Sequence, residues 1–394
     1  AAMAAAAAAN PYAAMHAHAL PRLQFACLDA SVALAPVLRQ FRSVVLTSGT
    51  MSPLDMYPKM LRFEPVLQQR FAMSLSRACV CPLVVTRGAD QVAISSKFEQ
   101  RDDPAVVRSY GALLVDMARV TPDGLIVFFP SYFYLEFLVG AWDELGVLQR
   151  VLRHKLLFVE TDSADESALA LHNYRRACDA GRGAVLLAVA RGKVSEGVDF
   201  TGHYARAVML VGIPYVYTQS RVLRARLEFL RDNFGIREND FLAFDAIRTA
   251  AQCIGRILRA KTDYGVVVLA DRRFNRAEKF KKLPEWLLQH IEPGKMNLSS
   301  DMAVEVARHF YKQMAQPLPL SAQLGTSLWT AAHVRAAEQR RRALEPAAVA
   351  AAAVAAAQAP PSSQRADENA AMAAAAGQFV AALPDDDDDD DDDD

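Results

Sequence analysis

The stretch Ala184-Val185-Leu186-Leu187-Ala188-Val189 is apolar throughout and leads into the charged segment Ala190-Arg191-Gly192-Lys193-Val194-Ser195-Glu196-Gly197-Val198-Asp199-Phe200. A short uninterrupted apolar run is typical of a strand that is buried on both faces. Two glycines around basic, hydroxyl and acidic side chains suit a loop that touches phosphate and also holds a ribose or a metal-bound water. A polar surface loop explains the same residues, but the position directly after a strand favours a functional loop.

Other short apolar runs recur between residues 22 and 320 and are interpreted as strands: Ser43–Leu46, Leu83–Val85, Leu125–Phe129, Leu156–Val159, Ala207–Val211 and Val266–Leu269. Helical periodicity occupies the stretches between many of them: Asp103–Val120, with Asp103-Pro104 as cap and first turn, Ser131–Leu145, Glu166–Ala180, Ser220–Asn233 and Asn239–Ala260. This alternation predicts an α/β fold with a parallel sheet covered by helices on both faces. Ligands of such sheets bind at the loops that follow the strands.

The 394 residues carry a formal net charge of −1, which taken alone argues against a nucleic-acid-binding protein. The average conceals an asymmetry. Residues 331–394 contain five basic and fourteen acidic side chains, including the run Asp385–Asp394, whereas the preceding 330 residues contain 39 basic and 31 acidic ones. A basic globular part joined to an acidic end indicates a nucleic acid or a membrane surface as a partner.

The cysteines are scattered and odd in number, which implies no disulfide framework and fits a reducing compartment: Cys27, Cys79, Cys81, Cys178 and Cys253. Cys79-x-Cys81 lacks the two further ligands of a zinc or iron–sulfur site, so both are interpreted as structural thiols and no metal site is expected. No apolar run reaches the roughly 18 residues of a membrane span. The Ala-rich start lacks a basic region, so a signal peptide is not expected and the chain is expected to be cut or mis-started there.

Two further segments carry hydroxyl and guanidinium groups. Thr47-Ser48-Gly49-Thr50 follows a predicted strand and lets the backbone approach a ligand, although an ordinary turn explains it as well. In the stretch from Gln252 to Arg259, the residues Gln252, Arg256 and Arg259 are spaced i, i+4, i+7 and are expected on one helix face. Guanidiniums bind phosphate as a fork, and one of them can act as an arginine finger on a γ-phosphate. A solvated basic face fits the spacing equally well.

Aromatic residues mark two more strand ends. Phe128-Phe129-Pro130-Ser131-Tyr132-Phe133 could stack a base and hold a phosphate, or its rings could simply belong to the core. The segment from Pro214 to Arg221 leads into an Arg-rich helix, which fits a track for single-stranded nucleic acid. A solvated helix face with an aromatic anchor explains that segment too.

The order of these segments resembles motifs III to VI of superfamily 2 helicases: Ser-Gly-Thr, Phe-Phe-Pro-Ser-Tyr, Arg-Gly-Lys-x-Ser-Glu-Gly-x-Asp-Phe and Gln-x-x-Gly-Arg-x-x-Arg. From about Leu23 to about Leu328 the sequence is similar, residue by residue, to the XPD-like family, the helicase subunits of TFIIH. The stretches that carry this closer resemblance are Cys27–Ser31, Thr47–Asp55, Asp90–Glu99 and Asn239–Leu242. The resemblance implies a RecA-like motor domain.

The resemblance also implies roles for individual residues. Arg256 and Arg259 match the family's arginine fingers, with Gln252 on the nucleotide face. The positions expected to bind the nucleotide, or to couple its state to movement, are Ser48, Gly49, Thr50, Gly192, Glu196, Gly197 and Asp199. The positions expected to contact single-stranded DNA are Ser131, Tyr132, Arg191, Lys193 and Tyr215.

The sequence contains neither Gly-x4-Gly-Lys-Ser/Thr nor Asp-Glu-x-His, and it lacks the family's four cluster cysteines. It therefore resembles the back half of such a helicase. The expected divisions are a low-complexity leader (1–21), the returning end of motor domain 1 (22–55), motor domain 2 (56–290), a C-terminal docking region (291–330) and a disordered Ala-rich and poly-Asp tail (331–394).

The function that the resemblance implies is that of the second motor domain of an ATP-dependent 5′-to-3′ DNA helicase. It would act in the nucleus, in nucleotide-excision repair and transcription initiation, with single-stranded DNA and TFIIH core subunits as partners. ATP and Mg²⁺ are expected to be held mostly by the missing motor domain 1, the iron–sulfur cluster is not expected in this chain, and the chain alone is predicted to be inactive. Two other interpretations stay open: a catalytically silent scaffold that keeps only the docking surface, and a relative from another repair pathway.

Overall fold

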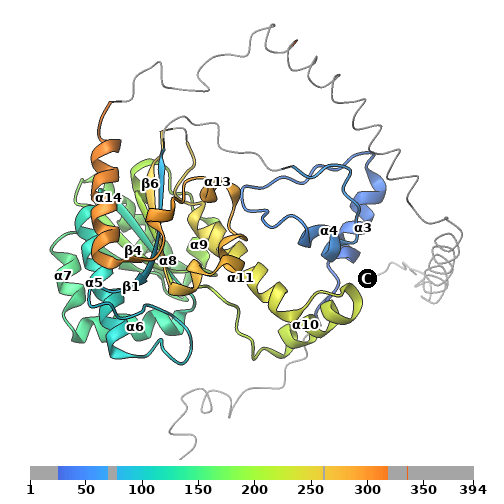
Figure 1. The fold of residues 1–394 in the computed structure, drawn as a ribbon, viewed down its shortest axis with the longest axis horizontal. Helices are drawn as coiled ribbons and strands as arrows, with labels where there is room; N and C mark the ends of the chain where they lie inside the picture. The colour runs from blue at the N-terminus through green and yellow to red at the C-terminus, as the bar shows by residue number, and fades with distance from the viewer. Residues whose placement is uncertain (1–24, 70–77, 261, 318–334, 336–394) are drawn as a thin grey trace, which may run out of the picture. The chain divides into compact units, whose positions relative to one another are not determined.

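The computed structural model describes residues 25–69, 78–260, 262–317 and 335 (Figure 1). The strands are β1 (Val80–Arg87), β2 (Gly124–Phe129), β3 (Leu156–Val159), β4 (Ala184–Val189), β5 (Ala207–Val211), β6 (Gly265–Ala270) and β7 (Leu298–Ser299). The helices are α3 (Ser31–Gln40), α4 (Met56–Leu61), α5 (Pro104–Val120), α6 (Tyr132–Glu144), α7 (Val147–Leu152), α8 (Ala164–Asp179), α9 (Lys193–Gly197), α10 (Arg221–Phe234), α11 (Glu238–Ile254), α12 (Ala277–Phe280), α13 (Glu285–Leu288) and α14 (Ser300–Met314).

Internal contacts divide the chain into two units, Ala1–Leu324 and Gly325–Asp394, and every element named above belongs to the first. The predicted leader 1–21 and, apart from Arg335, the predicted tail 331–394 lie outside the described residues. No helix in the described part of the chain is long and apolar enough to cross a membrane.

The seven strands form one sheet in the order β3-β4-β2-β5-β6-β1-β7, and all of its pairs are parallel. Six of the strands coincide with apolar runs in the sequence. The strand β2 lies between β4 and β5, with Phe129 opposite Val189 and Phe128 opposite Leu210. Because the strands run the same way, the loops that follow β2, β4 and β5 leave the sheet where its strands end. This carboxyl-terminal edge of the sheet is called the loop edge.

Alternate side chains of each strand enter two separate cores. Val127 and Phe129 pack with buried residues of α5, α6, α7 and α14, whereas Ile126 and Phe128 pack with α8, α9, α11 and α13. Figure 1 shows these two groups of helices around the strands. The predicted fold, a parallel sheet covered on both faces, is confirmed. The core interpretation also holds for Phe128 and Phe129, which are both buried.

The major helices begin where capping side chains stand in the sequence. The Asp103 carboxylate accepts a hydrogen bond from the Ala105 amide, and Pro104 occupies the first turn of α5. The hydroxyls of Ser131, Ser163 and Ser220 cap α6, α8 and α10 in the same way. These caps fix where each chain segment leaves the loop edge and turns back along the sheet.

Two predicted elements are wrong. Ser43–Leu46 is not a strand: it is irregular and exposed, because no neighbouring strand among the described residues pairs with it. The predicted helix Asn239–Ala260 ends six residues early, at Ile254. Gly255 follows, with its poor helix propensity, and the Asp263 carboxylate then accepts hydrogen bonds from the Arg259 and Ala260 amides, which fixes a turn in place of further helix.

A third, smaller core joins the segment before the sheet to two later helices. Met56 of α4 packs with Leu227 of α10 and with Phe244 of α11, and the Tyr57 ring meets the Phe244 ring edge-on at 5.4 Å between centroids. The Arg62 guanidinium lies 4.6 Å from the centre of the Phe234 ring. The stretch that carries Thr47–Thr50 is thereby connected to the helix that leads to Arg256.

Candidate functional site

The candidate site is built around the loop after β4. The Ala190 amide donates to the Phe129 carbonyl at 2.8 Å, which fastens the loop to the end of β2. Ser195 is buried and its hydroxyl donates to the Gly192 carbonyl, while the Lys193 ammonium donates to the Asp162 carbonyl at 2.6 Å. Gly192 precedes the short helix α9, in which Glu196 and Gly197 lie, and Gly197 is exposed.

Arg256 and Arg259 both contact this loop. Arg256 donates from Nη1 to the Val198 carbonyl at 2.7 Å and from Nη2 to the Ser195 carbonyl. Arg259 Nε lies 3.2 Å from the Asp199 Oδ1, in a pair whose side chains are 42% and 62% exposed. The first guanidinium is therefore part of the loop's framework, whereas the second sits on its surface.

The prediction that Gln252, Arg256 and Arg259 share one helix face is wrong, because α11 ends at Ile254. Gln252 lies in the last helical turn and is partly exposed, and the two arginines follow in the turn beyond it. The three residues still lie on one short segment that adjoins the loop after β4. The turn, rather than a helix face, determines where the two guanidiniums point.

The segment Thr47–Thr50 meets the same region. The Ser48 hydroxyl accepts a hydrogen bond from the Thr50 amide at 3.2 Å, and the indole of Trp286 in α13 donates to the Gly49 carbonyl at 3.1 Å. A Cβ placed on Gly255 would lie 3.9 Å from the Thr50 methyl group. The segment is a turn, and it lies against the end of α11 just before Arg256.

The start of α6 reaches the loop through a residue that sequence reasoning missed. The Ser131 hydroxyl caps α6 by accepting from the Tyr134 amide at 3.2 Å. The Tyr132 hydroxyl donates at 3.2 Å to Glu160, a buried carboxylate directly after β3. Burial first, and then the Glu160 charge, raises the pKa of the Tyr132 phenol to about 12. The one feature of the sequence that points to Glu160 is its position, as an acidic residue directly after the apolar run Leu156–Val159.

Arg191 and Tyr215, two of the predicted DNA contacts, are both engaged by neighbouring side chains. Arg191 Nη2 donates at 2.7 Å to Asp245 of α11 and at 3.0 Å to the Pro214 carbonyl. The Tyr215 hydroxyl accepts a hydrogen bond from the Lys279 ammonium. Arg191 thereby connects the loop after β4 to the loop after β5, and Tyr215 brings a second cation to that edge.

A buried ion pair at the end of β6 was also missed. Asp271 is fully buried and accepts from the Ser96 amide at 2.8 Å, while Arg273 Nη2 reaches its carboxylate at 2.8 Å and the Ser96 hydroxyl at 2.8 Å. Gly212, with φ of +84°, passes so close that a Cβ there would lie 1.9 Å from the Ser96 hydroxyl oxygen. This cluster fixes the segment after β1 against the ends of β5 and β6.

The segment fixed in this way exposes aromatic and basic groups. Phe98 is 74% exposed, and the Arg101 guanidinium lies 4.5 Å from its ring centre and 5.7 Å from that of Phe133. Phe133, the residue after Tyr132, is 46% exposed. Flat exposed rings beside guanidiniums suit the stacking of unpaired bases. Neither Phe98 nor Arg101 was among the predicted contacts.

The chain is similar in sequence to known helicases. Residues 114–290 match the family described as Helicase C-terminal domain. The chain is 58% identical over 311 residues to the "General transcription and DNA repair factor IIH helicase subunit XPD" of Dictyostelium discoideum and 60% identical over 310 residues to that of Schizosaccharomyces pombe. Each match covers 79% of this chain but only 40% of the relative.

A solved structure titled "XPD_Helicase" aligns with 69% of this chain and 45% of its own, at 21% identity and a TM-score of 0.48. The predicted resemblance is confirmed by the sequence identity to the XPD subunits over 79% of the chain. The chain contains a helicase C-terminal domain at residues 114–290 and, over 79% of its length, is 58% and 60% identical to these two XPD helicase subunits.

Proposed function

We propose that this chain is the second motor domain of an ATP-dependent 5′-to-3′ DNA helicase that works within TFIIH in the nucleus, in nucleotide-excision repair and transcription initiation. The observation that carries the proposal is the meeting of Arg256 and Arg259 with the loop after β4, at the edge where parallel sheets bind ligands. The identity to XPD subunits, which are named for transcription and DNA repair, supports DNA as the substrate and TFIIH as the complex.

ATP is the substrate of this proposed reaction, and the chain supplies only part of its site. The pair of Arg259 with Asp199 is exposed, so its guanidinium can exchange the carboxylate for a γ-phosphate at little cost. A guanidinium placed there stabilises the charge that develops during phosphoryl transfer. We assign the phosphate cradle and the Mg²⁺ ligands to a first motor domain, because this sequence has neither Gly-x4-Gly-Lys-Ser/Thr nor Asp-Glu-x-His.

A phosphate-release assay with single-stranded DNA tests the assignment of roles. The chain alone is expected to release phosphate from ATP no faster than its Arg256→Ala variant does. Steady turnover that Arg256→Ala abolishes would show that the chain holds ATP by itself and would contradict the division of the site between two domains.

The nucleic-acid side of the proposal concerns the exposed rings and cations beside Tyr132. We expect the chain to bind a labelled single-stranded oligonucleotide weakly, with an affinity that falls as salt rises from low to physiological concentration. Phe98→Ala removes an exposed ring and is expected to weaken binding several-fold, whereas Leu169→Ala removes an exposed apolar side chain of α8 and serves as the control. Affinity that is independent of salt would contradict a DNA track at this edge.

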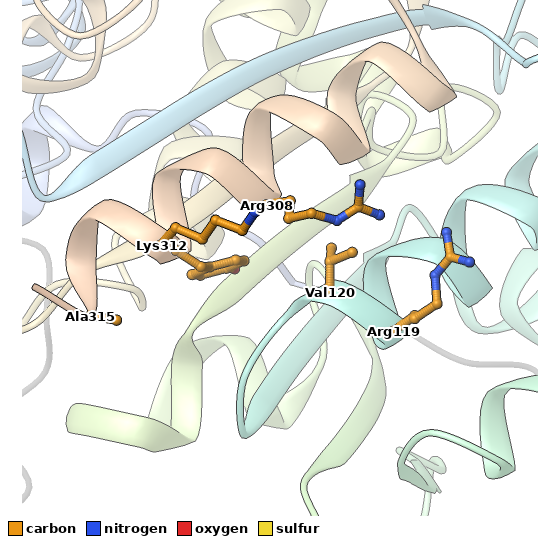
Figure 2. A pocket seen from close by; sticks show the side chains of 6 residues that line it. Arg119, Val120, Arg308, Lys312 and Ala315 are labelled. Carbon is orange, nitrogen blue, oxygen red and sulfur yellow. The ribbon is translucent and has the colours of Figure 1, made fainter.

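A second candidate role, as a docking scaffold, is favoured by a groove between α5 and α14. Figure 2 shows Arg119 and Val120 facing Arg308, Lys312 and Ala315 across it, and its volume is about 520 Å³. Arg119 and Arg308 pair with acids one turn earlier on their own helices, Asp116 and Glu305. The helix α14 falls within the predicted docking region 291–330, and we assign this groove to a TFIIH core subunit.

Co-purification tests the docking role. Lys312→Glu reverses a charge in the groove and is expected to abolish capture of a TFIIH core subunit. Lys59→Glu, at an exposed position on α4, is expected to leave capture unchanged. Equal capture by both variants would remove the groove from the proposal.

A further inference from the structure

Glu160 is a buried carboxylate at which three segments of the loop edge meet. Its Oε1 accepts hydrogen bonds from the Tyr132 hydroxyl at 3.2 Å and from the Val194 amide at 3.0 Å. Its Oε2 accepts from the Val189 amide at 2.8 Å. The donors belong to the start of α6, the end of β4 and the helix α9, so one side chain binds the segments that follow β2 and β4 while standing itself at the end of β3.

The loop is shaped to receive this carboxylate. Gly192 passes so close that a Cβ on it would lie 2.5 Å from Glu160 Oε1 and 2.7 Å from Oε2. Only a residue without a side chain leaves room for the carboxylate at that point. The amide of Gly192 itself donates to the Val189 carbonyl at 2.8 Å, which turns the loop around the acid.

Within the described part of the chain, the hydrogen-bond donors to the Glu160 oxygens are two amides and one phenol, with no guanidinium or ammonium group among them. A buried carboxylate depends strongly on such donors, because each one lost leaves charge in a medium that solvates it poorly. The Tyr132 hydroxyl and the Val194 amide both donate to Glu160 Oε1. A displacement of Tyr132 therefore changes the strength of the hydrogen bond that Val194 makes with that oxygen. The Tyr132 ring and the Val194 amide are in this way coupled through Glu160 Oε1, beside a direct interaction of the Tyr132 hydroxyl with the Lys193 backbone at the start of α9.

We propose that Glu160 is a positioning residue that couples the Ser131–Tyr132 turn, on the DNA side, to the loop after β4, on the nucleotide side. The assignment of the two sides rests on the proposed function, whereas the coupling itself rests on the three hydrogen bonds. Glu160 touches neither ligand in this role. It transmits the position of the Tyr132 hydroxyl to the amide of Val194, and so to Ser195, whose carbonyl accepts from Arg256.

Hydrogen exchange of individual amides, followed by NMR on the full chain, tests the coupling. Glu160→Gln keeps the shape but removes one acceptor oxygen and the charge, and it is expected to accelerate exchange at Val189 and Val194 about tenfold. The Val194 amide proton is also expected to shift upfield, because it loses a charged acceptor. Glu136→Gln, on the exposed side of α6, is the control and leaves both amides unchanged.

Tyr132→Phe provides the decisive measurement, since it removes a hydroxyl that does not touch Val194. We expect exchange at Val194 to accelerate about threefold in the native background and to stay constant in the Glu160→Gln background. Equal acceleration in both backgrounds would show that the coupling does not pass through Glu160 and would overturn the inference. If Glu160→Gln fails to fold, unchanged exchange at Val194 in Tyr132→Phe alone overturns it.

These results are independent of the proposed function. Loss of oligonucleotide binding in every assay would refute the DNA side of that function while leaving the exchange at Val194 as measured. Conversely, additive exchange effects would refute the coupling in a chain that binds DNA as expected.

Discussion

Arg256 and Arg259 are three residues apart, yet they make opposite kinds of contact with one loop. Arg256 donates to two backbone carbonyls, those of Ser195 and Val198, whereas Arg259 pairs with the exposed Asp199 carboxylate. One guanidinium therefore maintains the loop and the other is available at its surface. The family motif assigns the same role to both arginines, but their different contacts predict different effects when each is removed.

This difference predicts unequal costs in stability. Arg256→Ala leaves two carbonyls without a charged donor and is expected to lower the free energy of unfolding by about 1–3 kcal/mol. Arg259→Ala breaks an exposed ion pair and is expected to cost less than about 1 kcal/mol. Denaturant unfolding of the two variants measures both values, and equal losses would contradict the distinction.

Gly192 gives a second prediction, about space. Gly192→Ala places a methyl group 2.5 Å from Glu160 Oε1, so the free energy of unfolding should fall by about 1–3 kcal/mol. Gly197→Ala, at the other end of the short helix that Gly192 precedes, is the matched control, because nothing lies within 4 Å of its added methyl group. That variant is expected to be neutral or slightly stabilising. If Gly197→Ala were as unstable as Gly192→Ala, the loss would come from the conformation of the loop backbone and not from the Glu160 carboxylate.

The ion pair at the end of β6 predicts a larger effect. Asp271→Asn leaves the Arg273 guanidinium largely buried without its charge partner and is expected to cost about 3–5 kcal/mol. Asp232→Asn removes the acid of an exposed pair with Arg231 and should cost far less, because solvent screens that pair. Thermal unfolding of both variants checks the ranking, which a similar fall in Tm would refute.

The acidic run Asp385–Asp394 predicts an effect on nucleic-acid affinity. Ten carboxylates on a chain whose first 330 residues are basic compete electrostatically with a polyanion. Deletion of residues 385–394 is expected to tighten binding of single-stranded DNA at low salt, by an amount that disappears at high salt. Affinity that the deletion leaves unchanged at low salt would show that the run plays no part in binding.

Six of the seven strands could be predicted because each contains an apolar run that carries its own signal, as in Ala184–Val189, whereas the two-residue strand β7 is too short to carry one. Ser43–Leu46 shows the limit of that signal: its composition is the same, but a strand also needs neighbours, and no local pattern reports whether they exist. The helix that was expected to reach Ala260 failed for a related reason. Its end depends on Asp263, whose carboxylate binds backbone amides of the turn, and on a glycine that the periodicity tolerates.

The predicted residues that follow β2, β4 and β5 lie at one edge of the sheet because these strands are parallel and their loops leave on the same side. Arg256 could be assigned from its motif, but its loop partners could not, since they are backbone carbonyls without sequence identity. Glu160 and Asp271 escaped notice because each is a lone acid with no motif around it. Both stand directly after an apolar strand, which is the one feature that identifies them in the sequence.

The strand β2 also separates two surfaces. The helix α5, which contributes Arg119 and Val120 to the groove, leads into the amino end of β2 at Gly124, while the segment after Phe129 opens the loop edge. Six extended residues span roughly 20 Å. A protein seated in the groove would therefore leave the loops at the other end of β2 uncovered, so a docked partner and a ligand of those loops would not compete for one surface.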